Sequence, residues 1–345
     1  MTVIPGNLED ALTPEWLGGI LPSHGDGSRI VDVEEVARVQ DIDFKPKVVR
    51  FKVRYEDGSS MPLCLKAVFS DPNSKASNQT AVHEARFFGQ IAPHLSIRLP
   101  SVAAAPIDEE RGVGLILMGD LAEDGARFVN VLEPWDVAWV SDILEQMARL
   151  HAVENVIGPV DNLGWIRRNV EWLPQVLTVE RLEALMSDSR RAGLPGRTGD
   201  ARLAIESMHA FAAIDRERPP FLIHGDAHAS NIFILPEGPG LMDWQMLQKG
   251  SWALDVAYHI NAVLPVEIAE REERALFEYY LDRAREYGAN PPELETAWLE
   301  YRQSLVYGYF LAVITRSFPQ PLIDETCKRL AHAVDRHDTF RLLGV

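Results

Sequence analysis

The chain has 345 residues, of which 46% are hydrophobic and 25% are charged, so it carries enough apolar material for one large or two medium-sized cores. Its 34 lysines and arginines and 51 aspartates and glutamates give a formal net charge of -17, which repels polyanions and argues against broad nucleic-acid binding. The two cysteines are too few for a disulfide framework, and neither a signal-peptide pattern nor a membrane-spanning apolar run is found. We therefore expect a cytoplasmic protein that binds neither nucleic acid nor membrane.

The first third of the chain predicts a small β-sheet with one helix. Residues 48–68 contain two apolar runs that flank an Asp-Gly turn cluster, a pattern typical of a β-hairpin. Between residues 79 and 91 apolar side chains recur at helical spacing, and a proline follows where a helix should end. Two further strand candidates, residues 101–107 and 112–118, lie on either side of an acidic turn.

Helical periodicity dominates beyond residue 121. A core helix is expected to begin at Pro134, a favourable first helical residue, and to continue to Leu150. Further helices are expected near residues 179–191, 199–213, 253–263, 266–287 and 292–317. Short β-like segments interrupt them at residues 221–234 and 240–242. Because no flexible linker or repeat occurs, we expect a hinge that separates residues 1–118 from residues 119–345.

The densest group of polar residues lies in an apolar frame at residues 221–243. In this segment Asp226 can accept a proton, Asn231 offers a carbonyl oxygen, and Asp243 offers a carboxylate after a second short strand. Hard oxygen ligands of this kind suit Mg²⁺, which proteins usually share with substrate phosphates. The cluster indicates phosphoryl transfer, which needs a base or orienting group, metal ligands and a cation for the remaining charge.

Lys66 is the candidate for that cation. It lies in the apolar run LCLKAV, where an unpaired ammonium group would be costly, so we expect an anionic partner. Glu84, on the helix that follows, is the natural candidate. Such a pair can hold the ammonium group toward nucleotide phosphates.

In these motifs the chain resembles the protein-kinase-like superfamily, in the branch of aminoglycoside phosphotransferases and choline kinases. The catalytic loop of that branch reads H-G-D-x-H-x-x-N, and the chain matches it at His224, Gly225, Asp226, His228 and Asn231. The segments LMDW, LILMGDL, ARLHA and SWALDVAYHI extend the resemblance over most of residues 48–263. Within the branch, HEARFFGQIAPHLSIRLPSV and LILMGDL are most similar to ecdysteroid-kinase-like bacterial phosphotransferase sequences.

The resemblance implies a bilobed α+β fold. Its small N-terminal lobe, a β-sheet with one key helix, would bind the nucleotide, and its larger, mainly helical C-terminal lobe would carry catalysis and the acceptor. The reaction would transfer the γ-phosphoryl group of ATP, or of GTP, to a hydroxyl group of a small molecule with the help of Mg²⁺. We expect a monomer or a homodimer.

The resemblance also assigns roles to individual residues. Asp226 would be the catalytic base, and Asn231 and Asp243 would bind Mg²⁺. Lys66 would contact the α- and β-phosphates and would be held by Glu84. Backbone groups in the hinge-like segment would contact adenine, at Met118, Gly119, Asp120 and Leu121. The residues expected to support the loop are His224 and Asp255.

One segment departs from the family pattern and motivates an alternative. Residues 36–51, where a glycine-rich phosphate loop is expected, contain no glycine. A pseudokinase that binds nucleotide as a regulator is therefore the first alternative. The second is a metal-dependent hydrolase, in which alternate strand positions would project three side chains to one side as zinc ligands, namely His224, Asp226 and His228.

The sequence does not determine the chemical identity of the acceptor. Aminoglycoside, choline-like, sugar, steroid and hydroxy-acid acceptors all remain open, because fold analogy does not transfer specificity. The subfamily likeness favours a lipophilic alcohol, and the aromatic content of residues 279–310 is compatible with one. Four tryptophans are further pocket candidates, namely Trp165, Trp172, Trp244 and Trp252.

Overall fold

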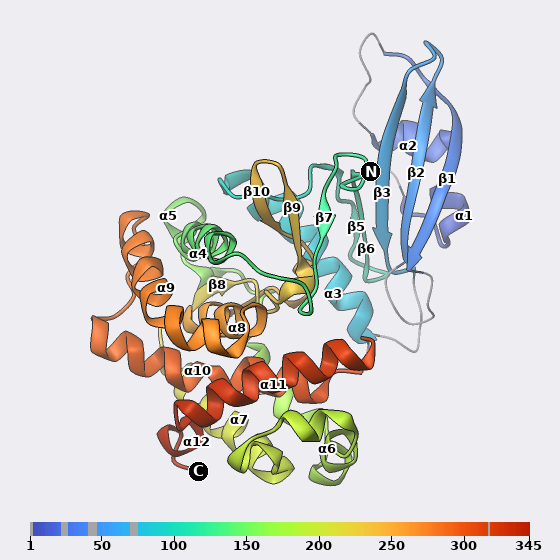
Figure 1. Cartoon of the computed structure of the whole chain (residues 1–345). Helices are drawn as coiled ribbons and strands as arrows, with labels where there is room; N and C mark the ends of the chain where they lie inside the picture. Colours follow the sequence, from blue (N-terminus) through green and yellow to red (C-terminus); the bar gives the residue numbers. More distant parts are fainter. Residues whose placement is uncertain (1–2, 22–26, 41–46, 70–74, 317) are drawn as a thin grey trace. The chain divides into compact units, whose positions relative to one another are not determined.

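The computed structural model describes residues 3–21, 27–40, 47–69, 75–316 and 318–345 (Figure 1). The chain divides into two compact units. Unit 1 consists of Met1–His94, Leu99–Arg127 and Met242–Gln245, and unit 2 consists of Leu95–Arg98, Phe128–Leu241 and Met246–Val345. The boundary between residues 118 and 119 stays a prediction.

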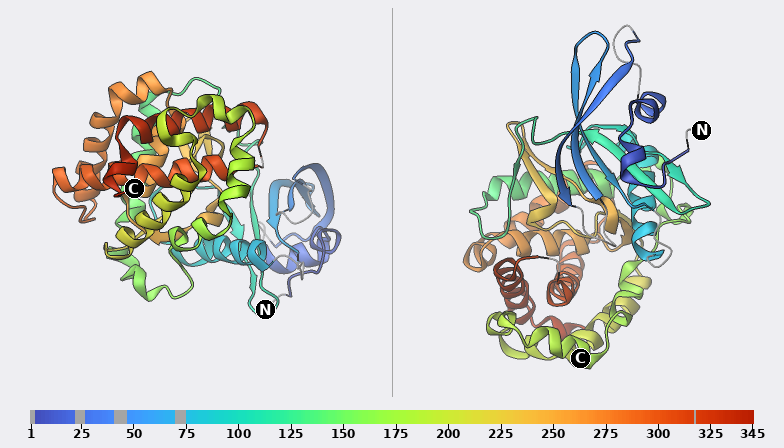
Figure 2. Two further views of the ribbon diagram at one scale, coloured as in Figure 1. Left: turned by 90° about the horizontal axis from the view of Figure 1, so that it is seen from below. Right: turned by 90° about the vertical axis from the view of Figure 1, so that its right-hand side faces the viewer.

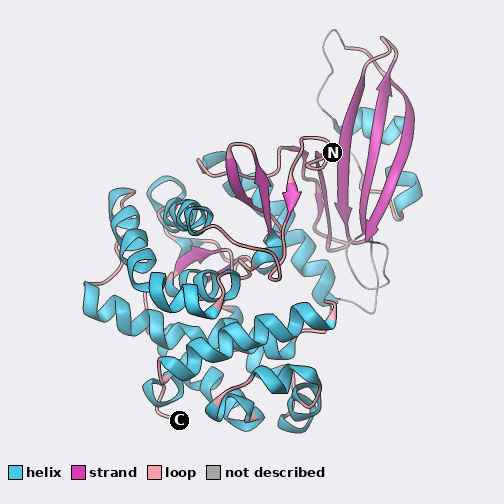
Figure 3. Ribbon diagram, viewed as in Figure 1, coloured by secondary structure: helices cyan, strands magenta, loops and turns pink. Residues whose placement is uncertain are grey.

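Unit 1 is built on an antiparallel sheet with the strand order β1-β2-β3-β6-β4, in which β5 also pairs with β6 (Figure 3). The predicted hairpin is confirmed as β2 and β3, whose register pairs Val53 with Met61. The strands are β1 (Ile30–Gln40), β2 (Lys47–Tyr55), β3 (Ser60–Ala67), β4 (Val102–Ala104), β5 (Ile107–Asp108) and β6 (Val113–Gly119).

Strand β1 was not expected from the sequence. It is an edge strand, and the side chains of its residues 30–39 are all exposed or half-buried. Its sequence IVDVEEVARVQ therefore lacks the strict alternation that a half-buried strand shows. The glycine-free segment is divided between β1 and β2, and its residues 41–46 lie outside the described residues.

The helices of unit 1 are α1 (Leu8–Ala11), α2 (Pro14–Ile20) and α3 (Lys75–Arg86). The predicted helix at residues 79–91 is present as the end of α3 and a π-helical turn, Phe87–Ile91. Helices α1 and α2 were not expected from the sequence; they begin at side-chain caps made by Asn7 and Thr13. Leu8 and Leu17 from these helices join the core beneath the sheet.

Unit 2 is mainly helical (Figure 2). Its helix α10 lies against α7, α8 and α11. The described helices are α4 (Val137–His151), α5 (Glu154–Ile157), α6 (Val179–Met186), α7 (Ala201–Arg216), α8 (Ala253–Val263), α9 (Val266–Glu286), α10 (Leu294–Ile314), α11 (Gln320–Arg336) and α12 (Thr339–Leu342). The predicted α+β fold, with an N-terminal antiparallel sheet and a larger helical part, is confirmed.

The helices of unit 2 differ from the expectation most clearly at the start of α4 and at the C-terminal end of the chain. Helix α4 begins after Asp136, whose side chain accepts a hydrogen bond from the Ala138 backbone N–H, so Pro134 precedes the helix. Helices α11 and α12 lie beyond the last predicted helix. A proline in the first turn of α11 is compatible with a helix start, because the N–H that it lacks has no partner within the helix.

Short strands frame the predicted polar cluster. Strand β8 (Phe221–Ile223) pairs with β11 (Gln248–Gly250), whereas β9 (Ile232–Leu235) forms a hairpin with β10 (Gly238–Leu241). A two-residue strand, β7 (Arg127–Phe128), completes the second sheet. The segment between β8 and β9 thus connects two different sheets.

Most of the aromatic residues expected near the acceptor lie in the core of unit 2. Tyr280, Tyr301 and Tyr307 are fully buried, and the ring of Trp298 stacks on that of Tyr301 with 5.0 Å between centroids. Trp252 is buried as well and stacks on Tyr280. The aromatic content of residues 279–310 therefore stabilises the helical core. Among the described residues, no helix is both long and apolar enough to cross a bilayer.

Candidate active site

The loop that follows β8 is held by Asp255, in the first turn of α8. One oxygen of Asp255 accepts a hydrogen bond from the His224 backbone N–H at 2.7 Å, and the other accepts one from Gly225 N–H at 2.8 Å. Gly225 has a φ of 79°, and a Cβ atom there would lie 2.5 Å from the Met246 carbonyl oxygen. The glycine of the motif is therefore required by backbone conformation and by space.

The Asp255 carboxylate is fully buried and stays charged. Burial by itself would raise the pKa of Asp255, but the contact with His151, at 3.3 Å, and the Gly225 N–H lower it below its usual value. His151, on α4, also contacts the Tyr280 hydroxyl at 2.7 Å. This network gives His224 and Asp255 the geometry of supports of the loop, as the resemblance implies.

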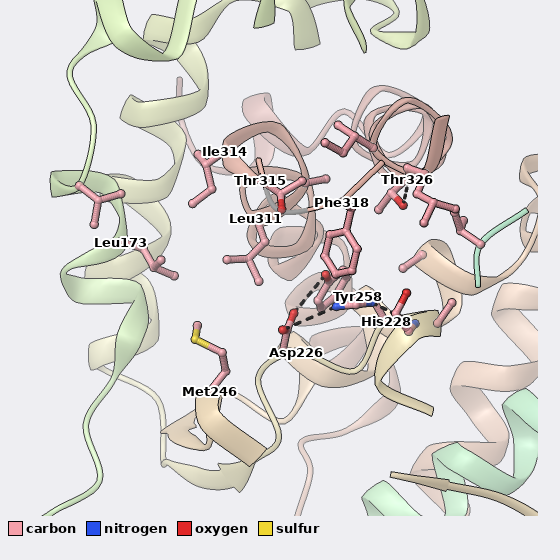
Figure 4. A pocket seen from close by; sticks show the side chains of 18 of the residues that line it. Leu173, Asp226, His228, Met246, Tyr258, Leu311, Ile314, Thr315, Phe318 and Thr326 are labelled. Carbon is pink, nitrogen blue, oxygen red and sulfur yellow. Dashed lines mark hydrogen bonds and ion pairs between the residues drawn. The ribbon is translucent and has the colours of Figure 1, made fainter. Parts of the chain in front are cut away.

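Asp226 is the carboxylate that this loop presents. Asn231 Nδ2 donates a hydrogen bond to Asp226 Oδ2 at 3.1 Å and another to the Asp226 carbonyl oxygen at 2.8 Å. The Tyr258 hydroxyl donates to Asp226 Oδ1 at 3.4 Å, and His228 Nε2 lies 3.7 Å from Oδ2 (Figure 4). The Asp226 side chain remains 27% exposed and lines a cavity of about 300 Å³ within unit 2. An oriented carboxylate that solvent still reaches is suited to accept a proton.

The zinc-site geometry of the hydrolase alternative is wrong. Strand β8 ends at Ile223, so His224, Asp226 and His228 do not occupy alternate positions of a strand. Across the part of the chain that the structure describes, no group of three or more His, Cys, Asp or Glu side chains is placed to hold a metal ion.

Unit 1 contains a second cluster, which is built around Lys66 on β3. Its ammonium group lies 2.9 Å from Glu84 Oε1 on α3, so the predicted ion pair is present. It also lies 2.9 Å from Asp243 Oδ1, a contact that the sequence analysis did not predict. No local pattern signals this contact, because Asp243 is far from Lys66 in the sequence.

The two carboxylates keep Lys66 charged. Burial alone would lower the pKa of Lys66, but the charges of Asp243 and Glu84 outweigh it and raise the pKa above its ordinary value. The segment that carries Asp243 is anchored on α3, because Trp244 N–H donates to Glu84 Oε1 at 3.0 Å. The Trp244 ring stacks on Phe87 with 3.8 Å between centroids. Trp244 is therefore a core residue.

The hinge-like segment that ends β6 is also held in place. Met118 and Gly119 pair with Cys64 and Leu63 of β3. Arg50 Nε donates to both carboxylate oxygens of the buried Asp120, at 3.0 and 2.8 Å. The Asp120 side chain thus anchors the segment, and contact of its backbone with adenine stays a prediction.

Three comparisons place these features among known proteins. The model of the phosphotransferase enzyme family matches residues 46–292, more than half of the chain. A search of curated protein sequences found no match. Among solved structures, spectinomycin phosphotransferase in complex with ADP and spectinomycin has a TM-score of 0.51 and 10% identity, with 94% of this chain and 97% of that chain covered.

Two further structures show the same fold. The choline kinase LicA of Streptococcus pneumoniae, in complex with AMP, has a TM-score of 0.50 and 12% identity, with 94% of this chain and 97% of that chain covered. The GDP and kanamycin complex of the phosphotransferase APH(2″)-IIIa has a TM-score of 0.50 and 13% identity, with coverages of 93% and 97%. The match over residues 46–292 shows that the chain belongs to the phosphotransferase enzyme family, and it is therefore a phosphotransferase.

Proposed function

We propose that the protein transfers the γ-phosphoryl group of Mg²⁺-bound ATP to an alcohol, with Asp226 as the catalytic base. The observation that carries this proposal is the geometry of Asp226. Its carboxylate is oriented by Asn231 and Tyr258, lies on a loop held by Asp255, and lines a cavity. As the acceptor oxygen attacks the γ-phosphorus, its proton passes to Asp226, and the bond from phosphorus to the bridging oxygen breaks to release ADP.

The residues available for Mg²⁺ fit a hard cation. Asn231 uses its amide nitrogen to hold Asp226, which leaves its carbonyl oxygen without a recorded partner among the described residues. The Asp243 side chain is 41% exposed, although one oxygen contacts Lys66. Carboxylate and amide oxygens are ordinary Mg²⁺ ligands, and the ion would neutralise phosphate charge when bound. Asn231 and Asp243 are therefore the ligands that we propose.

The nucleotide would be held by the other residues of unit 1. Lys66, kept charged by Glu84, would contact the α- and β-phosphates, and backbone groups of the segment Met118–Leu121 would contact adenine. The related structures are complexes with ADP, AMP and GDP, so ATP and GTP should be tested side by side. Three statements remain predictions from the sequence. They are the cytoplasmic location, the monomeric or homodimeric state, and the similarity to ecdysteroid-kinase-like sequences.

The test compares two aspartates of unit 2. Asp226→Asn should lower kcat for acceptor-dependent ADP release about 10²- to 10⁴-fold, while calorimetric binding of Mg²⁺-ATP stays close to wild type. Asp282→Asn, at an exposed position on α9, is the matched control and should leave both unchanged. Asp243→Asn should weaken binding of Mg²⁺-ATP more than binding of ATP without the metal. Wild-type turnover in Asp226→Asn would overturn the assignment of the base.

A further inference from the structure

We infer that the acceptor is a neutral lipophilic alcohol, whose apolar body occupies the cavity beside Asp226. This inference rests on the proposed function, because it takes Asp226 as the group that receives the acceptor's proton. The cavity measures about 300 Å³ and lies wholly within unit 2. That volume is at the lower end of the range of ligand pockets, so it fits one medium-sized molecule or the apolar part of a larger one.

Aliphatic side chains make up most of the cavity wall. They come from several separate parts of unit 2, including the ends of α10 and α11, and Figure 4 shows Leu311, Ile314 and Phe318 on the same side of the Asp226 carboxylate. The aliphatic lining includes Val131, Leu173, Val176, Leu311, Ile314 and Leu322. Such a wall stabilises a ligand by the apolar area that the ligand removes from water.

Some of the apolar side chains that line the cavity are exposed to solvent. Trp172, Val176 and Phe318 line it and are 44%, 41% and 38% exposed. Single exposed apolar residues are ordinary, but several that share one cavity are typical of a binding site. The sequence offered four tryptophans as pocket candidates. Of these, Trp172 lines this cavity, whereas Trp165, Trp244 and Trp252 do not.

The small number of carboxylates in the lining disfavours an acceptor with several positive charges. Asp226 is its only carboxylate among the described residues, and no lysine or arginine lines the cavity. An aminoglycoside carries several ammonium groups, and most of them would lie against apolar wall without an anionic partner, which is costly. A single quaternary ammonium group would need aromatic faces around it, whereas aliphatic residues outnumber the four lining rings, those of Trp172, His228, Tyr258 and Phe318.

Several polar groups of the lining are already engaged. The Thr326 hydroxyl donates to the Leu322 carbonyl oxygen at 2.8 Å, and His228 Nδ1 accepts a hydrogen bond from the Ser230 N–H at 3.2 Å. The directed groups left for the hydroxyls of a sugar, among them those of Ser230, Thr315 and Asp226, are fewer than the aliphatic residues of the wall. One hydroxyl at Asp226 and an apolar body along the wall match the lining best.

The experiment uses a series of straight-chain primary alcohols from butanol to octanol. Binding to the full-length protein without nucleotide is measured by calorimetry, and kcat/KM is measured with Mg²⁺-ATP through ADP release and phosphorus NMR of the product. We expect affinity and kcat/KM to rise about fourfold for each added methylene until the cavity is full. Choline, glucose and kanamycin serve as charged and polar comparison acceptors.

Two valine variants test the location. Val176→Asp places a charge at an exposed position of the lining and should raise the Kd for octanol at least about fivefold. Val156→Asp is the matched control, because Val156 lies on α5, is 64% exposed and does not line the cavity. The control should behave like wild type in both measurements.

The two readouts separate failure of this inference from failure of the proposed function. Transfer to kanamycin, choline or glucose, with no binding or transfer for the alcohols, would overturn the lipophilic acceptor and keep the kinase. Binding of the alcohols that strengthens with chain length and weakens in Val176→Asp, without transfer to any acceptor, would support the cavity assignment and overturn the kinase mechanism. Equal binding in Val176→Asp and Val156→Asp would overturn the placement in this cavity.

Discussion

The two clusters of functional side chains, one in each unit, are held by different kinds of partner. In unit 1, Lys66 contacts two carboxylates, Glu84 and Asp243, both at 2.9 Å. In unit 2, the Asp226 carboxylate contacts neutral donors, the amide of Asn231 and the hydroxyl of Tyr258. The first arrangement keeps a cation charged where burial disfavours it, and the second orients a carboxylate without pairing it with a buried cation.

This difference matches the two tasks of phosphoryl transfer. A charged lysine is suited to phosphate groups, whereas a carboxylate engaged in a strong ion pair would be a poor proton acceptor. A buried carboxylate of unit 2 supports Asp226 from one step away, at Asp255, which accepts hydrogen bonds from the loop backbone. Substitutions at four positions, namely Asp255, Lys66, Glu84 and His259, can break or sharpen this comparison.

The largest effect is expected at Asp255. Asp255→Asn removes the buried charge and offers an N–H group to backbone donors, so the free energy of unfolding should fall by about 3 to 5 kcal/mol. Urea unfolding followed by circular dichroism measures this change. The exposed control Asp282→Asn should stay within about 0.5 kcal/mol of wild type. A loss below 1 kcal/mol at Asp255 would show that the loop is held by other contacts.

Next in size is the effect expected at Lys66. Lys66→Met removes the cation that we assign to the nucleotide phosphates, so kcat/KM for Mg²⁺-ATP should fall about 10²- to 10³-fold. Glu84→Gln should cost less, because Asp243 still contacts Lys66. Lys328→Met, at an exposed position on α11, is the control. Equal activity in Lys66→Met and Lys328→Met would remove Lys66 from the mechanism.

The smallest effect is a pH dependence at His259. His259 Nδ1 donates to the Ala227 carbonyl oxygen at 2.9 Å, directly after Asp226, while Nε2 is buried and has no recorded partner among the described residues. Burial lowers the pKa of His259 from 6.5 to about 4, so the unfolded state binds the proton first as the pH falls. The free energy of unfolding should therefore decrease between pH 6.5 and pH 4, by about 3 kcal/mol from this group.

The substitution His259→Asn isolates this contribution. Its amide can still donate to Ala227, but it does not titrate, so the variant should lose less stability on acidification than wild type. Urea unfolding at pH 7.0 and pH 4.5 provides the comparison, because other titrating groups are shared by the two proteins. Parallel losses in the two proteins would show that His259 does not sense pH.

Local sequence patterns predicted several structural parts correctly. The β2 and β3 hairpin follows from alternating apolar residues around a turn, and the pairing of Lys66 with Glu84 follows from a lysine in an apolar strand. The amphipathic helices of unit 2 follow from their spacing. By contrast, β1 lies at the edge of the sheet and only a few of its side chains are half-buried, so its sequence carries no strong period.

The family motifs were thus determined by the sequence alone, because the loop of residues 224–231, the strand lysine and the LMDW segment are short and carry their residues at fixed spacing. Tertiary structure alone decided which side chains meet across long stretches of chain. It brought Asp243 to Lys66 and Arg50 to Asp120, and it buried the aromatic residues of α10 while aliphatic residues line the cavity. The physical reason is that periodicity specifies which face of an element is apolar, whereas packing decides whether that face meets the core or a ligand.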